Sequence, residues 1–339
     1  MATPVERRGP HFAAGQLAIG VDAGATKIAA ALVTAEGEVA AAEQLPTRPE
    51  RGAAAVLDDM ARLMQPWLAE HDAAIRGVGI GTPGQVNSDA GIVRNAVNLG
   101  WDEVALSAEI KARLGYEVPV WVQKDANASA LGEYIYGAAQ GYDDFVYIGV
   151  GSGLGGGVVA GGRLITGANW NAAELGHLSL DPEGAVCNCG NRGCAETVVS
   201  GPGLVALAGR YLGEARFASG LAGEEITTEA VLREAAVGDE LALAALSEVG
   251  RHLGIVIAAC VAILNPALIV LGGGLGLAAF DFLVPPARAE LARRTLAASA
   301  DVLAVLPSQV ASSAVGAASL VWYFDKLRAD EARHQVERR

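Results

Sequence analysis

The sequence predicts an α/β protein built from two lobes of similar architecture. Its 339 residues exceed the usual length of one compact core, and its 43 glycines suit many tight connections between strands. The order strand, Gly-rich loop, strand, turn, strand occurs twice, and the tripeptide IGV at residues 19–21 recurs at residues 148–150. In this alignment Gly24 corresponds to Gly153. A tandem duplication is the simplest account of the repeat, and the alternative is a coincidental match of a short motif.

Hydrophobic periodicity divides the chain into four parts. They are a disordered lead at residues 1–15, a small N-terminal lobe at 16–127, a large lobe at 128–313 and a charged, frayed tail at 328–339. Strands are expected at residues 17–21, 28–33, 78–81, 118–122 and 145–150. Helices are expected at residues 53–65, 126–136, 204–212, 241–264 and 314–327. The last of these helices is expected to complete the small lobe.

Charge and hydropathy exclude two classes of partner. The net charge of -13, without a cluster of Lys and Arg, argues against binding to nucleic acid. No signal peptide is recognisable, so we expect a cytoplasmic protein. The apolar run at residues 253–271 is nearly long enough to span a membrane. We expect Asn265 and Pro266 to break it into a buried helix and a short strand, and we expect no membrane partner.

Three of the four cysteines lie in one short loop. Cys187, Cys189 and Cys194 follow His177 closely, whereas Cys260 is expected to be a packed core thiol. In a cytosolic protein such a cluster favours a metal or redox site over structural disulfides. Three thiolates and one imidazole would complete a tetrahedral Cys3His zinc site, closed and therefore structural. The alternative is three ordinary buried thiols beside an unrelated histidine.

Two Gly-rich loops and one aspartate suggest phosphoryl transfer. The loops at residues 22–27 and 151–157 can form nests of backbone N–H groups that bind phosphate, although either loop alone is weak evidence. The Walker pattern is absent, which disfavours a P-loop enzyme. Asp125 follows a predicted strand, where a carboxylate can act as a general base. It could instead cap the following helix.

Several motifs together resemble the ROK family (repressors, open reading frames and sugar kinases). They are DxGxTK at residues 22–27, GTPG at 81–84, NLGW at 98–101, DANA at 125–128, GxGxGGG at 151–157, ExGH at 174–177, CxCGxxGCxE at 187–196 and IVLGGG at 269–274. Their order spans about residues 17–320, and among family members the sequence looks most like bacterial glucokinases.

The resemblance implies an actin-like, ribonuclease-H-like ATPase fold, with an active-site cleft between the lobes and a structural zinc loop at residues 177–196. It implies ATP and Mg2+, with Asp22 orienting the Mg2+ through water and Thr26 bonding a phosphate oxygen. The implied ATP and phosphate residues are Asp22, Gly24, Thr26, Lys27, Gly151, Gly153, Gly155, Gly272, Gly273 and Gly274. The implied zinc ligands are His177, Cys187, Cys189 and Cys194.

The implied reaction is phosphorylation of the 6-hydroxyl of a hexose, foremost glucose, with Asp125 as general base. The implied sugar-binding residues are Gly84, Lys124, Asp125, Glu174, His177 and Glu196. Other hexoses, N-acyl hexosamines, amino sugars and cyclitols remain open as substrates. The family also implies a homodimer or homotetramer. A repressor is disfavoured because only residues 1–16 precede the first motif, too few for a DNA-binding domain.

Four positions depart from the family pattern. Ala25, Trp170 and Ala173 stand where the family has glycine, and the two alanines are tolerable if their φ angles are negative. Lys124 stands where the family has an asparagine that binds a sugar hydroxyl, but lysine only donates hydrogen bonds. Three explanations are open: an altered substrate, a Lys124 that turns outward, or impaired catalysis that leaves a noncatalytic sugar-binding protein.

Overall fold

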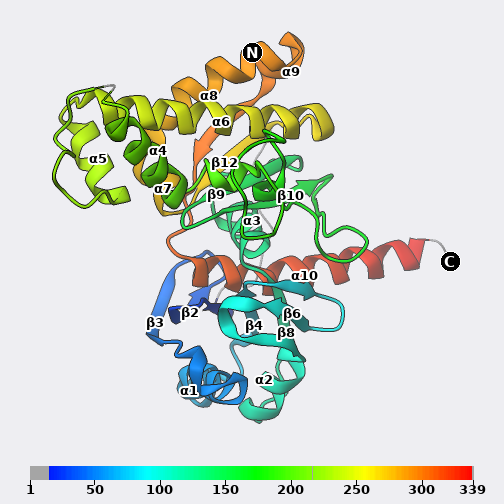
Figure 1. Cartoon of the computed structure of the whole chain (residues 1–339). Helices are drawn as coiled ribbons and strands as arrows, with labels where there is room; N and C mark the ends of the chain where they lie inside the picture. The colour runs from blue at the N-terminus through cyan, green and yellow to red at the C-terminus, as the bar shows by residue number, and fades with distance from the viewer. Residues whose placement is uncertain (1–14, 216, 338–339) are drawn as a thin grey trace. The chain divides into compact units, whose positions relative to one another are not determined.

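The computed structural model describes residues 15–215 and 217–337, and the chain divides into two compact units. Unit 1 comprises Met1–Gly141, Leu164–Ala172 and Gln309–Arg339, and unit 2 comprises Tyr142–Arg163 and Ala173–Ser308 (Figure 1). The disordered lead predicted at residues 1–15 lies outside the described residues except for Gly15.

Unit 1 contains a five-stranded sheet in the order β3-β2-β1-β4-β8. These strands are β1 (Leu17–Ala23), β2 (Lys27–Thr34), β3 (Val39–Pro46), β4 (Ile75–Thr82) and β8 (Val120–Lys124). β2 is antiparallel to β1 and β3, whereas β4 is parallel to β1 and to β8. A smaller antiparallel sheet contains β5 (Gln85–Asn87), β6 (Ile92–Ala96) and β7 (Trp101–Val104). The helices are η1 (Pro49–Arg51), α1 (Ala53–His71), η2 (Val97–Leu99), α2 (Leu106–Leu114), α3 (Asp125–Tyr136) and α10 (Ser313–Glu337).

Glycines let α10 pack directly on the main sheet of unit 1. Gly20 of β1 and Gly79 of β4 are neighbours across the sheet. A Cβ on Gly20 would lie 1.9 Å from the backbone oxygen of Ala314, and a Cβ on Gly79 would lie 1.9 Å from that of Ala317. Both distances are far below van der Waals contact, so neither strand tolerates a side chain there without moving the helix.

Unit 2 repeats the same sheet topology in the order β11-β10-β9-β12-β13. Its strands are β9 (Phe145–Val150), β10 (Leu154–Ala160), β11 (Arg163–Leu164), β12 (Leu268–Gly272) and β13 (Ala304–Pro307). β10 is antiparallel to β9, and β12 is parallel to β9 and β13. The repeated IGV tripeptides therefore occupy the central strand of each sheet, in agreement with the duplication predicted from the sequence.

Helices of unit 2 surround one long apolar helix. They are η3 (Leu175–His177), η4 (Ala195–Thr197), α4 (Gly201–Gly213), α5 (Thr228–Ala236), α6 (Glu240–Leu264), α7 (Gly274–Ala278), α8 (Phe280–Arg294) and α9 (Ala297–Val302). α6 contacts α4, α5 and α8 (Figure 1). Among the described helices, α6 alone is long and apolar enough to cross a membrane, and 56% of its apolar window is buried in the protein. It ends at Asn265 in the left-handed conformation, and β12 follows, as predicted.

Two boundaries differ from the sequence-based expectation. The limit drawn after residue 127 falls inside α3, which is one continuous helix of unit 1 and packs against α10. The charged tail expected to be frayed at residues 328–339 is helical as far as Glu337, because α10 continues to that residue. Arg328 stacks over the ring of Trp121, and Arg333 pairs with Asp330, so both side chains support the helical extension.

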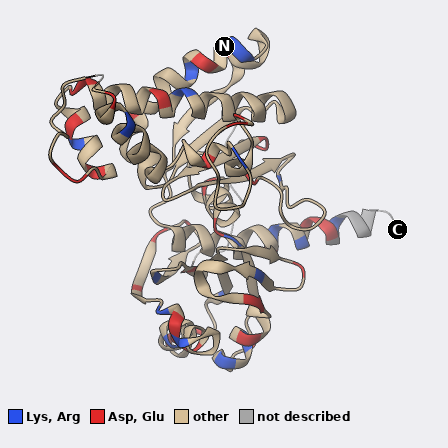
Figure 2. Ribbon diagram, in the orientation of Figure 1, with Lys and Arg blue, Asp and Glu red and all other residues tan. Residues whose placement is uncertain are grey.

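Acidic and basic side chains are mixed along the helices of each unit. On α8 and α10, Lys and Arg alternate with Asp and Glu (Figure 2). Such mixing agrees with the acidic composition, and neither helix presents the basic face that phosphate backbones attract.

Candidate active site

Asp22, Gly81 and Asp125 lie at one edge of the main sheet of unit 1. Asp22 near the end of β1 pairs with Gly81 of β4, and Asp125 directly follows β8. A Cβ on Gly81 would lie 3.7 Å from the Cα of Asp125, so this glycine leaves the space between the two aspartates open. Because parallel strands end at the same edge, residues 103 positions apart in sequence meet there.

The two carboxylates influence each other electrostatically. Burial, and next the negative charge of Asp125, raise the pKa of Asp22 from 3.8 to about 6. Lys27 and a hydrogen bond with the Ser313 side chain act in the opposite direction. Because its pKa is raised, ionising Asp22 costs free energy, and a bound cation would stabilise the ionised form.

Asp125 is the first residue of α3 and is exposed. The N-cap position belongs to Lys124, whose side chain makes no capping hydrogen bond. The Asp125 Oδ1 accepts a hydrogen bond of 2.7 Å from the backbone N–H of Ala126. The helix N-terminus thus supports the charged form of Asp125 while the carboxylate stays accessible to a ligand.

The loop at residues 22–27 is held by a residue that the sequence analysis did not select. The hydroxyl of Thr47, which is fully buried, donates a hydrogen bond of 2.6 Å to the carbonyl of Gly24. The Thr47 N–H also donates to the Thr26 carbonyl, and the Gly24 N–H donates to the Lys27 carbonyl. Thr26 and Lys27 remain exposed. No local motif marks Thr47, because its role depends on contact with a loop 20 residues earlier.

Lys124 does not turn outward to solvent. Its side chain is buried, with the residue 7% exposed, and its Nζ donates a hydrogen bond of 3.3 Å to the carbonyl of Ala172. Ala172 belongs to the segment Leu164–Ala172 of the same unit. The explanation that relied on an outward-facing lysine is therefore wrong.

In unit 2, Glu196 lies against the loop at residues 151–157. Its Oε2 accepts a hydrogen bond of 2.9 Å from the N–H of Leu154. A Cβ on Gly153 would lie 2.4 Å from the same oxygen, so a side chain there would displace the Glu196 carboxylate. Gly176 in turn lies against the Glu196 Cβ and the Leu154 carbonyl. The predicted phosphate loop and the predicted sugar motif ExGH are thus brought together with Glu196.

Two of the predicted nucleotide glycines are required by close contacts. Gly273 has a φ of 79°, and a Cβ there would lie 2.4 Å from the carbonyl oxygen of Val150. A Cβ on Gly272 would lie 2.5 Å from the Tyr147 hydroxyl. Gly274 begins α7, and a Cβ on it would meet no atom within 4 Å. The backbone of the turn after β12 therefore packs closely against β9.

Gly84 of unit 1 also has a backbone that requires glycine. Its φ is 95°, and a Cβ there would lie 2.8 Å from the carbonyl oxygen of Arg94. The GTPG turn after β4 can therefore bring its backbone close to a ligand.

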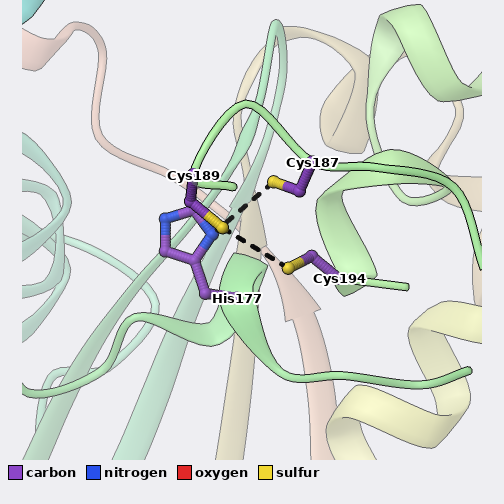
Figure 3. Close-up of side chains that lie close together, drawn as sticks. All are labelled: His177, Cys187, Cys189 and Cys194. Atoms are coloured by element: carbon purple, nitrogen blue, oxygen red, sulfur yellow. Dashed lines mark hydrogen bonds between the residues drawn. The ribbon is translucent and has the colours of Figure 1, made fainter. Parts of the chain in front are cut away.

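His177, Cys187, Cys189 and Cys194 form one cluster in unit 2 (Figure 3). Their ligand atoms all lie within 4.8 Å of one another. The Sγ atoms of Cys189 and Cys194 are 3.6 Å apart, and the Cys187 Sγ is 3.9 Å from the His177 Nδ1. A tetrahedron with Zn–S bonds of about 2.3 Å has edges of about 3.8 Å, so these separations fit zinc. The sulfur atoms are too far apart for a disulfide, and all three cysteines are free.

The thiols of the cluster differ in pKa, because a backbone hydrogen bond from Asn191 lowers the pKa of Cys189 whereas that of Cys194 is raised. Burial is the main reason that the pKa of Cys194 rises to about 12, so at neutral pH a metal is needed to hold it as a thiolate. Cys260 lies apart from the cluster in α6 and is buried, as predicted.

A cavity of about 400 Å³ lies in unit 2 beside the cysteine loop, lined mainly by that loop and by residues of α4 and α6. Of the predicted site residues only Cys194 lines it. It does not coincide with the glutamates or the Gly-rich loops described above.

Two of the replaced glycines have left-handed backbone. Trp170 and Ala173 both have a φ of 63°, whereas Ala25 is not among the described residues with positive φ. The condition of a negative φ is therefore not met at Ala173. A side chain in this conformation costs about 1 kcal/mol, because its Cβ approaches the following carbonyl oxygen.

Residues 18–323 match the ROK family. The chain is 36% identical over 276 residues to the glucokinase of Halalkalibacterium halodurans, covering 79% of this chain and 83% of that enzyme. It is 34% identical over 260 residues to the N-acetylmannosamine kinase of Escherichia fergusonii, covering 77% of this chain and 84% of that enzyme.

Two solved structures share the fold. One is a ROK family glucokinase from Streptomyces griseus in complex with glucose and AMPPNP, with a TM-score of 0.74, 33% identity and coverage of 90% of this chain and 98% of that chain. The other is a ROK family transcriptional regulator, a homolog of the E. coli MLC protein, with a TM-score of 0.81, 30% identity and coverage of 91% and 78%. These matches confirm the predicted fold class, and the chain belongs to the ROK family.

Proposed function

We propose that this protein is a sugar kinase that transfers the γ-phosphoryl group of ATP to the 6-hydroxyl of a hexose, foremost glucose. The observation that carries the proposal is the pair Asp22 and Asp125 at one sheet edge of unit 1, in a chain related to glucokinases. A regulator that only senses sugar has no need for a carboxylate with a raised pKa beside a second accessible carboxylate.

Asp125 acts as the general base in this proposal. It accepts the proton of the sugar hydroxyl as the phosphoryl group arrives, and its exposure at the start of α3 leaves its carboxylate accessible to that hydroxyl. Asp22 orients a magnesium ion, which would neutralise charge on the phosphates when bound. Backbone N–H groups of the loops at residues 22–27 and 151–157, together with the turn at residues 272–274, bind the nucleotide.

Unit 2 supplies the carboxylates for sugar recognition. Glu174 and Glu196 suit vicinal hydroxyls, since each carboxylate oxygen accepts hydrogen bonds. His177 has its Nδ1 directed at the cysteines, which leaves Nε2 as the nitrogen for a sugar hydroxyl. A structural zinc ion on His177, Cys187, Cys189 and Cys194 would fix the orientation of this imidazole. Gly84 has no side chain, so its backbone can approach the sugar closely.

Lys124 bears on the choice of substrate, because it stands where the family has an asparagine that binds a sugar hydroxyl. As alternatives to glucose, a buried lysine at this position supports a hexose recognised differently from glucose, or an N-acyl hexosamine, amino sugar or cyclitol. We further propose a cytoplasmic homodimer or homotetramer that binds neither nucleic acid nor membrane.

An ADP-release assay with Mg-ATP over a panel of hexoses, N-acyl hexosamines, amino sugars and cyclitols tests the proposal. Turnover that depends on one of these sugars supports it and names the substrate. Absence of sugar-dependent ADP release from folded, zinc-loaded protein, together with sugar binding in calorimetry, would leave a noncatalytic sugar-binding protein instead.

A further inference from the structure

Side chains of unit 1 form hydrogen bonds with its backbone near several of the points where one segment of unit 1 ends or the next begins. The Tyr323 hydroxyl accepts a hydrogen bond of 2.7 Å from the N–H of Leu164, the first residue of the segment Leu164–Ala172. The carboxylate of Glu133, which is fully buried, accepts hydrogen bonds from the N–H groups of Gln309 and Val310. Lys124 binds the Ala172 carbonyl, the last residue of the segment before unit 2.

The ammonium group of Lys124 is therefore used to hold backbone. Its bond to the Ala172 carbonyl spans 48 residues of sequence, and the lysine itself is buried at the end of β8. A hydrogen bond from a charged donor is stronger than a neutral one, particularly where water is excluded. Gln85 makes a second, more exposed bond to the same segment, from its Nε2 to the Asn169 carbonyl at 3.0 Å.

The bound carbonyl lies between the two strained residues. Trp170 precedes Ala172 by two positions and Ala173 follows it directly, and both have a φ of 63°. Left alone, non-glycine residues relax toward negative φ, which would change the direction of the chain at Glu174. A conformation of this kind persists only where surrounding contacts impose it.

We propose that Lys124 is a positioning residue that holds the segment Leu164–Ala172 in its strained conformation, and that its effect depends on Trp170 and Ala173. The effects of Lys124, Trp170 and Ala173 are thus coupled: the hydrogen bond from Lys124 offsets the backbone strain that arises because positions 170 and 173 are not glycine. Because Glu174 follows Ala173, this inference also assigns Lys124 an indirect role in sugar affinity, and that part rests on the proposed function.

Hydrogen exchange measures the anchor without reference to activity. We expect Lys124→Met to raise the exchange of amides at residues 164–173, including the Ala172 N–H bonded to the Thr166 carbonyl, by about tenfold. Exchange in β4 should stay unchanged, which shows that the unit remains folded. Lys111→Met, at an exposed lysine on α2, is the matched control and should change neither segment.

The same substitution in a Trp170→Gly/Ala173→Gly background tests the coupling. Glycine removes the strain, so after correction for intrinsic rates we expect Lys124→Met to raise exchange there by less than about threefold. Equal effects in the two backgrounds, or no effect of Lys124→Met in the unmodified chain, would overturn the proposal. If Lys124→Met does not fold, the glycine pair alone decides: slower exchange at residues 164–173 supports strain, and unchanged exchange refutes it.

Kinetics distinguish this inference from the proposed function. If the protein is a sugar kinase, Lys124→Met should raise the KM for the sugar about tenfold and leave kcat within about twofold. A coupled change in exchange with no kinase activity would uphold the anchor and reject the function. Kinase activity together with additive exchange effects would support the proposed function and reject the role of Lys124 as an anchor.

Discussion

Burial, and next the negative charge of the nearby Asp125, raise the pKa of Asp22 to about 6. Asp22 lies near the end of β1 and Asp125 directly follows β8 of the same sheet, while Gly81 of the intervening strand β4 pairs with Asp22. The negative charge of Asp125 beside the largely buried Asp22 is the reason that we propose a cation and a proton acceptor at this edge.

The first prediction concerns stability and pH. The folded protein holds the Asp22 proton up to about pH 6 and the unfolded chain only up to about 3.8. Ionised Asp22 therefore destabilises the fold, with no penalty below about pH 3.8 and the full penalty above about pH 6. At about 1.4 kcal/mol per pH unit this penalty is roughly 3 kcal/mol.

Replacing Asp22→Asn removes this penalty. Urea unfolding of magnesium-free protein should show a gain from the variant that grows between pH 4 and pH 7 and approaches about 3 kcal/mol. Asp125→Asn should give part of the same gain, because it removes one cause of the shift. A gain that is independent of pH would mean that the pKa of Asp22 is not raised.

The second prediction separates chemistry from binding. Asp125→Asn should lower kcat by about 10²- to 10⁴-fold, the usual contribution of a general base, while calorimetry still detects the sugar. Thr47→Val is a useful companion, because it loosens the loop at residues 22–27 and should raise the KM for ATP. A similar loss of kcat and of sugar affinity in Asp125→Asn would indicate a binding role for the carboxylate.

The third prediction concerns the metal. Purified protein should contain one zinc ion per chain, and Cys189→Ser should lose it, lower the free energy of unfolding by about 2 kcal/mol and raise the KM for the sugar. Cys260→Ala, at a buried thiol outside the cluster, should retain the zinc. Full zinc content in Cys189→Ser would refute the proposed ligand set.

The fourth prediction tests the packing of α10 on the sheet. A Cβ on Gly79 would lie 1.9 Å from the backbone oxygen of Ala317, so Gly79→Ala should destabilise the protein by about 3 kcal/mol. Gly213→Ala at the end of α4 is the control, because a Cβ there meets no atom within 4 Å. It should stabilise the protein by about 0.5 kcal/mol, through the lower entropy of the unfolded chain.

Features with short-range or periodic signals could be predicted from the sequence. The spacing of Cys187, Cys189 and Cys194 predicts a cluster because a turn of a few residues brings them together, and His177 joins it in the structure. The position of Asp125 after a predicted strand likewise predicts a place at a sheet edge, and in the structure Asp22 lies at the same edge. The Asn265–Pro266 break in the apolar run follows from local backbone restrictions.

Other features depend on contacts that no local pattern encodes. Thr47 contacts the Gly24 carbonyl only once the chain has folded. Gly79 is needed only because α10, more than 230 residues later in the sequence, packs against it. The bond of buried Lys124 to the Ala172 carbonyl, next to the positive φ of Ala173, likewise has no local sequence signal. A substituted residue in a family motif indicates from the sequence that this chain departs from the family. The contacts that the new residue makes are seen only in the structure.

The most direct test of the central claim is the identity of the phosphorylated product. Phosphorus NMR of a reaction with Mg-ATP and glucose should show a phosphate ester on the 6-oxygen, formed in equal amounts with ADP. The same reaction with 6-deoxyglucose should yield no ester. ADP formed without any sugar ester, or equal ADP release with glucose and 6-deoxyglucose, would contradict phosphoryl transfer to the 6-hydroxyl of glucose.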